Sequence, residues 1–183
     1  NRMSIGYATA LMLLSGGLYG FVGSEPQIFD ERFHTGNRFG LCFAGVAGAM
    51  AVAGYVNSRI VERLGMRKVS HTSVIAFVGI AVLHLIAALS GFETLAVFMV
   101  LQMALMAAYG LTTSNFGAIA MEPMAAIAGT ASSVQGAISA AFGGLIGAVI
   151  GQAYDGTTIP FALGLVLCGS SALAVVAITE RGR

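Results

Sequence analysis

The chain has 183 residues, of which 57% are hydrophobic and only 9% carry a charge. Soluble domains carry about 25% charged residues, and disordered chains combine low hydrophobicity with high charge, so both classes are excluded. Nine Lys and Arg residues nearly balance eight Asp and Glu residues, and this net charge of +1 excludes the basic footprint of a nucleic-acid-binding protein.

Six long apolar stretches follow one another along the chain, and they predict an all-α membrane protein with a single domain, residues 1–183. A helix needs about 20 residues to cross roughly 30 Å of hydrocarbon, whereas a membrane strand needs only about 9–11. Each stretch is long enough for a helix. The expected spans cover residues 4–33, 39–61, 69–89, 94–121, 127–154 and 160–178.

Short breaks rich in glycine, proline and polar residues separate the expected spans, and they belong at the membrane surfaces because backbone polar groups cannot stay unpaired in hydrocarbon. With both termini in the cytoplasm, seven basic residues face that side and only Arg32 and Arg38 face outward, as the positive-inside rule requires. The seven are Arg2, Arg59, Arg63, Arg67, Lys68, Arg181 and Arg183.

Glu25 is the candidate substrate-binding or proton-binding residue of the first span. A carboxylate at the bilayer centre costs about 2.5–3.5 kcal/mol on insertion scales, so a carboxylate kept there is usually functional. Counting about 20 residues from Ile5 places Glu25 nearer the outer surface, where a solvated interfacial acid is the alternative interpretation. The neighbouring Pro26 removes one helical hydrogen bond and predicts a kink.

The loop after the second span contains the run ERLGMRK, residues 62–68. Gly65 suits the left-handed turn that ends one helix and begins the next. Glu62 can pair with Arg63, with Arg67 or with a basic group on another helix, and the basic side chains, Lys68 included, can bind the carbonyl end of a neighbouring helix. Membrane anchoring explains the basic residues but neither the glycine nor the carboxylate. We therefore predict that this loop locks helices together during gating.

The fourth span carries a stripe formed by Gln102, Met106, Tyr109 and Thr113, at the spacing of one helical face. A glutamine in hydrocarbon needs a partner, which turns it toward other helices or water. Methionine adapts its shape and tyrosine both stacks and donates hydrogen bonds, so the stripe suits a drug-binding cavity. Hydrogen bonding between helices explains the same stripe without a ligand.

In the fifth span, Gly143, Gly147 and Gly151 recur every four residues, a spacing that lets helix backbones approach closely. Gln135 of the same span is a further candidate for lining a cavity. In the third span, His84 could titrate near neutrality, but its place away from the middle of the span favours packing.

The loops and cysteines offer no catalytic chemistry. Glu93 and Asp155 lie in outer turns, where we expect solvated caps. Cys42 and Cys168 lie in apolar runs and indicate neither a disulfide framework nor a metal site. Phosphate loops, metal-ligand spacings and nucleophile elbows are absent from the sequence, so we expect no enzymatic activity and no cofactor.

The 62–68 run resembles the loop signature of the major facilitator superfamily, roughly G-x-x-x-D-R-x-G-R-K, with Ser58 in place of the first glycine and Glu62 in place of the aspartate. The stretch SNFGAIAMEP at 114–123, followed by AGTASS at 128–133, resembles the carboxy-terminal half of the Bcr/CflA (bicyclomycin-resistance) drug:proton antiporters. The pair Phe39-Gly40 and the triplet Asn57-Ser58-Arg59 fit the same family.

This resemblance implies one half of a transporter, built as a 3+3 inverted repeat of helices in a bacterial inner membrane. Its partners would be the lipid bilayer, an amino-terminal six-helix half, protons and an amphiphilic drug exported by alternating access. The start at Asn1 rather than Met fits a fragment. Two alternatives stay open: a carrier of another solute, such as a sugar or metabolite, and a non-transporting or half-size subunit that acts as an oligomer.

Overall fold

The computed structural model describes residues 1–181, and this part of the chain is helical except for short turns and contains no strand. The all-α fold that the sequence predicts is therefore confirmed for these residues. Arg183, one of the basic residues assigned to the cytoplasmic side, lies outside them. The α-helices are α1 (Arg2–Gln27), α2 (Phe39–Leu64), α3 (Met66–Ser90), α4 (Leu95–Met121), α5 (Ala128–Gln152) and α6 (Ile159–Glu180).

Three short helices of other types complete the chain. A π-helix, Ile28–Arg32, continues α1 directly, and the 3-10 turns Gly36–Arg38 and Glu122–Ile127 precede α2 and α5. Within the second turn, Met124 has non-helical angles (φ −118°, ψ 26°), so the chain bends between α4 and α5.

Five helical segments of the described chain are long and apolar enough to cross a membrane. The longest of them, Leu95–Gln152, runs through α4, the bend at Met124 and α5. Their length and composition identify the chain as a membrane protein, as the hydropathy of the sequence predicts.

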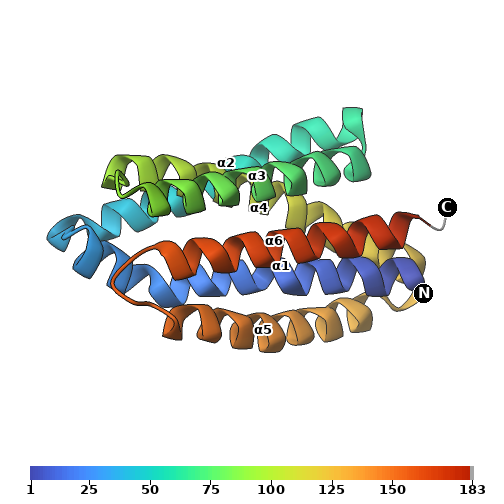
Figure 1. Ribbon diagram of the computed structural model, residues 1–183. Coiled ribbons are helices and arrows are strands. Elements are labelled where there is room, and N and C mark those ends of the chain that lie inside the picture. The colour runs from blue at the N-terminus through green and yellow to red at the C-terminus, as the bar shows by residue number, and fades with distance from the viewer. Residues whose placement is uncertain (182–183) are drawn as a thin grey trace.

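The helices run lengthwise beside one another, and successive helices point in opposite directions (Figure 1). The central helix is α1, which packs against α4, α5 and α6; α2 packs against α4, and α3 packs against both α4 and α6. The start of α1 and the end of α6 lie at one end of the bundle, here called the terminal end (Figure 1). The opposite end, here called the far end, carries the α1–α2, α3–α4 and α5–α6 connections.

Glycines with a positive φ lie at the breaks before and after α3. Gly91 ends α3 in the left-handed conformation (φ +72°, ψ −4°), which side chains other than glycine rarely adopt. Gly65, between α2 and α3, also has a positive φ of +80°, but its ψ of 148° makes it extended rather than left-handed helical. A single residue therefore separates the two helices, and the basic run stays close to the bundle.

An aromatic cluster fills the core near the far end. The Phe29 ring lies edge-on to Phe98 and Phe39, with centroid distances of 5.7 and 5.9 Å. Phe161 from α6 lies 6.2 Å from Phe98, and the His84 ring from α3 lies 5.2 Å from Phe98. These contacts join the π-helix, α2, α3, α4 and α6, so they fix how these elements meet at this end.

Candidate functional site

Arg67 connects three helical elements at the terminal end. It lies in the first turn of α3, and its guanidinium approaches the Glu180 carboxylate at the end of α6 to 3.7 Å. The same guanidinium lies 4.0 Å from the Glu122 carboxylate, at the start of the turn that follows α4. We call Arg67, Glu122 and Glu180, with the two residues described next, the terminal network.

Tyr7 and His71 extend this network into the core. Tyr7 is completely buried on α1, and its hydroxyl donates a hydrogen bond of 2.7 Å to the Glu180 carboxylate. The same hydroxyl lies 2.8 Å from Nε2 of His71, which follows Arg67 by one turn of α3. The network therefore joins α1, α3, α6 and the turn after α4 through a set of charged and hydrogen-bonded groups.

The other members of the loop run take no part in the terminal network. Glu62, Arg63 and Lys68 are exposed, and none of the ion pairs among residues 1–181 includes them. Arg67 thus pairs with carboxylates from distant helices and not with Glu62. The sequence patterns did not single out Glu122 or Glu180. The expected topology places only three acidic residues on the cytoplasmic side, Glu62, Glu122 and Glu180, and this small number could have identified them.

Glu25 lies near the far end of α1, as expected, and its side chain is only 8% exposed. Its Oε2 atom is buried without a hydrogen-bond partner among the described residues. Glu25 falls one helical turn after Phe21 and one turn before Phe29, and both of these rings are buried in the core. Pro26 lies inside α1, and the π-helix begins two residues later.

The α4 stripe lies inside the bundle. Gln102, Met106 and Tyr109 are buried, and both polar atoms of the Gln102 amide lack a hydrogen-bond partner among residues 1–181. Thr113 is half-buried, and its hydroxyl donates to the Tyr109 carbonyl over 3.0 Å. Met106 lines an apolar groove of about 180 Å³ between α1, α2 and α4. Ligand binding by the stripe stays a prediction.

The small residues of α5 lie against α1. A methyl group placed on Gly147 would come within 2.5 Å of the Tyr19 side chain and 2.7 Å of its backbone, and one on Gly143 within 2.9 Å of Ser15. At Gly151 the nearest atoms, on Gly23 of α1, would be 3.8 Å away. Close approach of the two backbones therefore depends most on Gly147.

Gln135 lies near the start of α5, at the wall of a groove of about 340 Å³ between α1, α5 and the turn that precedes α5. The groove is lined mainly by apolar side chains, Ile5, Met124 and Ile138 among them. The Gln135 amide oxygen is buried without a hydrogen-bond partner in the described part of the chain. Gln135 is therefore a predicted binding residue that the structure places at an open groove.

Glu93 corrects an expectation. Instead of a solvated cap, it is 6% exposed, and its Oε2 accepts a hydrogen bond from the Thr158 hydroxyl. Burial raises the pKa of the Glu93 carboxyl above its usual value, while the Thr158 hydrogen bond and the nearby Arg32 act in the opposite direction. Asp155 is the exposed cap that was expected, and hydrogen bonds from Thr157 lower its pKa.

Cys42 and Cys168 are free thiols, and residues 1–181 contain no group of three or more His, Cys, Asp or Glu side chains that could hold a metal ion. Comparison with protein-family models, with curated proteins and with solved structures finds no match to this chain.

Proposed function

We propose that this chain is the carboxy-terminal six-helix half of a major facilitator exporter, with proton-coupled multidrug efflux by alternating access as its activity. The observation that carries the proposal is the terminal network. Arg67, a basic residue of the loop run, reaches carboxylates on two distant elements, as a residue that locks helices during gating should.

Six membrane crossings, with both termini in the cytoplasm of a bacterium, form part of the proposal. At about 1.5 Å per residue, a straight helix of the 58 residues from Leu95 to Gln152 would extend about 87 Å. Hydrocarbon is only about 30 Å thick, and the bend at Met124 supports two crossings for this segment. The alternating directions of the helices support the same topology (Figure 1).

A second six-helix bundle is the partner that we propose. Large apolar side chains remain exposed along α2 and α5, with Leu41 and Val52 on α2 and Phe142 and Leu145 on α5 each more than half exposed. Packing against another bundle would cover parts of these helices, and lipid would cover the rest.

The side chains proposed to meet drug and protons are Glu25, Gln102, Met106, Tyr109, Thr113 and Gln135. Support comes from buried polar atoms on Glu25, Gln102 and Gln135 that lack partners in the described part of the chain, because such groups in membrane helices usually mark substrate or ion pathways. Gln102 and Tyr109 are buried, so ligand binding to these two residues requires α4 to separate from its neighbours, as alternating access would allow.

The test compares Arg67→Ala with Lys68→Ala in the complete gene product that contains this chain. Ion pairs between partly exposed groups contribute only about 0–1 kcal/mol to stability, and the Arg67 pairs are partly exposed. Arg67→Ala should therefore fold, yet lower proton-driven efflux of ethidium from cells at least tenfold. Lys68→Ala, an exposed residue of the same charge, should keep efflux near wild type.

Equal efflux in the two variants would contradict the role of the terminal network. Absence of ethidium efflux from the wild-type protein, together with uptake or release of a sugar or metabolite, would replace the drug exporter with the alternative carrier.

A further inference from the structure

Two turns that are distant in the sequence are joined by one hydrogen bond at the far end. Glu93 belongs to the turn between α3 and α4, and Thr158 is the residue that precedes α6. The Thr158 hydroxyl donates to Oε2 of Glu93, and both side chains are buried. We call this contact the Glu93–Thr158 clasp.

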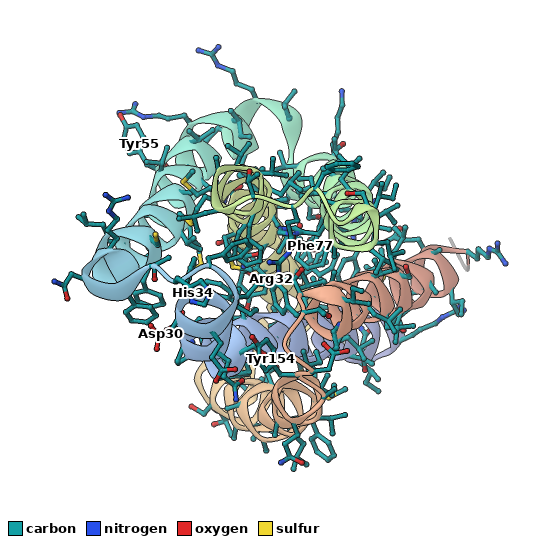
Figure 2. All side chains as sticks on the ribbon, turned by 60° about the vertical axis from the view of Figure 1, so that its left-hand side comes forward. Asp30, Arg32, His34, Tyr55, Phe77 and Tyr154 are labelled. Atoms are coloured by element: carbon teal, nitrogen blue, oxygen red, sulfur yellow. The ribbon has the colours of Figure 1, made fainter. Side chains whose placement is uncertain are left out.

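Few charged groups surround the clasp. Arg32, at the end of the π-helix, is the cation whose field reaches Glu93, and in Figure 2 it lies nearer the middle of the bundle than Asp30 and His34, which are exposed at the rim. The sequence of α4 contains no Asp, Glu, Lys, Arg or His, and of these residue types α6 contains only Glu180, at the opposite end.

The other titratable groups near the clasp lie deeper in the bundle or in the neighbouring α5–α6 turn. On α3, His84 is buried against Phe98 and Phe161 in the aromatic cluster. In the α5–α6 turn, the Tyr154 hydroxyl is engaged with the Gln27 carbonyl, and Asp155 is exposed and bound to Thr157. Glu93 is thus the one buried carboxylate that bridges two turns in the described chain.

The bonding of the carboxylate suits a neutral rather than an ionised group. Oε1 of Glu93 is buried without a hydrogen-bond partner among residues 1–181, whereas an ionised carboxylate needs donors at both oxygens. The Thr158 hydroxyl can donate to Oε2 in either state. Burial also raises the pKa of Glu93, which agrees with a preference for the protonated form inside the clasp.

We propose that Glu93 is a proton-binding residue that holds the α3–α4 and α5–α6 turns together when protonated and releases them when ionised. On ionisation the proton passes to water, and the carboxylate moves out toward water and Arg32, so the hydrogen bond from Thr158 is broken. The inference rests on contacts within this chain and does not depend on the transport function proposed above.

The pH range follows from the direction of the shift. An acid whose pKa is higher in the closed clasp than in the open one favours the closed form fully below pH 4.5, the ordinary pKa of glutamate. As pH rises above that value, the opening constant increases by up to about tenfold per pH unit. The opening constant stops increasing once the pH exceeds the pKa of the Glu93 carboxyl in the closed clasp.

Hydrogen–deuterium exchange of the purified chain in lipid nanodiscs, from pH 4 to pH 9, tests the proposal. The amides of Phe98 and Ala162 report on the two turns, because they bond to the Thr94 and Thr158 carbonyls. After correction for intrinsic exchange rates, their protection in the wild-type chain should fall as pH rises. In Glu93→Gln, which stays neutral, protection should be high at every pH.

Two more variants test which carboxylate titrates and whether the hydrogen bond from Thr158 is needed. Asp155→Asn removes an exposed carboxylate from the neighbouring turn and should keep the wild-type pH dependence. Thr158→Val removes the donor and should lower protection across the whole range. Protection in the wild-type chain that does not change with pH would overturn the proposal, and so would an Asp155→Asn variant that abolishes the change.

Discussion

Single polar groups buried in an apolar bundle are the most unusual feature at the scale of residues. Both ring nitrogens of His84 and both amide atoms of Gln102 lack hydrogen-bond partners in the described chain, as does Oε2 of Glu25. All three residues could be identified from the sequence, because each interrupts a long apolar run. Their surroundings could not, because those depend on which helices pack against them.

The surroundings of Glu93 and Glu180 were even harder to predict from the sequence. Glu93 lies two residues after a glycine in a short turn, which is typical of a solvated residue, but its side chain is buried against Thr158, 65 residues away. Glu180 lies two residues beyond the last expected span, and its partners Tyr7 and Arg67 lie more than one hundred residues earlier. Sequence patterns within one helix contain no information on such contacts.

Gly147→Ala should destabilise the bundle by about 1–3 kcal/mol, the usual cost of overpacking, because its new methyl group would overlap the backbone of Tyr19 on α1. Gly144→Ala is the matched control, since no atom of residues 1–181 outside the helix itself lies within 4 Å of a methyl group at that position. Thermal unfolding of the purified chain in detergent measures both. A Gly147→Ala midpoint equal to that of Gly144→Ala would show that α1 and α5 do not pack this closely.

Among the helical elements, α1 organises the bundle. It lies between α5 on one side and α4 and α6 on the other, and its π-helical extension carries Phe29 into the aromatic cluster at the far end. The expected first span, 4–33, agrees with the observed helix within two residues at its start and one at the end of its π-helix. Hydropathy predicts such limits well because the thickness of hydrocarbon sets the length of each span.

Phe29→Ala should lower the thermal midpoint strongly, because a fully buried ring is replaced by a cavity where the π-helix, α2 and α4 meet. Removing a buried phenylalanine costs about 3–5 kcal/mol in cores of soluble proteins, and packing also stabilises helix contacts in membranes. Phe92→Ala is the control, since that ring is 87% exposed. Equal midpoints for the two variants would contradict the packing of the extension.

For the molecule as a whole, the order of the helices and their turns follows from the sequence, but their arrangement does not. Glycine and proline mark the breaks, and apolar length marks the helices between them. That α1 becomes central and that α2 contacts mainly α4 depends on side-chain packing between faces that are all apolar. The weak amphipathic character of these helices leaves little in the sequence to orient them.

We propose an antiparallel membrane bundle whose far end faces outward, and labelling of single cysteines in intact cells tests this topology most directly. In a chain with Cys42 and Cys168 replaced by serine, single cysteines at Asp155 and at Phe92 should react with a membrane-impermeant maleimide added outside. Cysteines at Met124 and at Lys68 should react only after the membrane is permeabilised. Labelling of positions 124 and 155 from the same side would contradict the account, because the chain between them would then not cross the membrane.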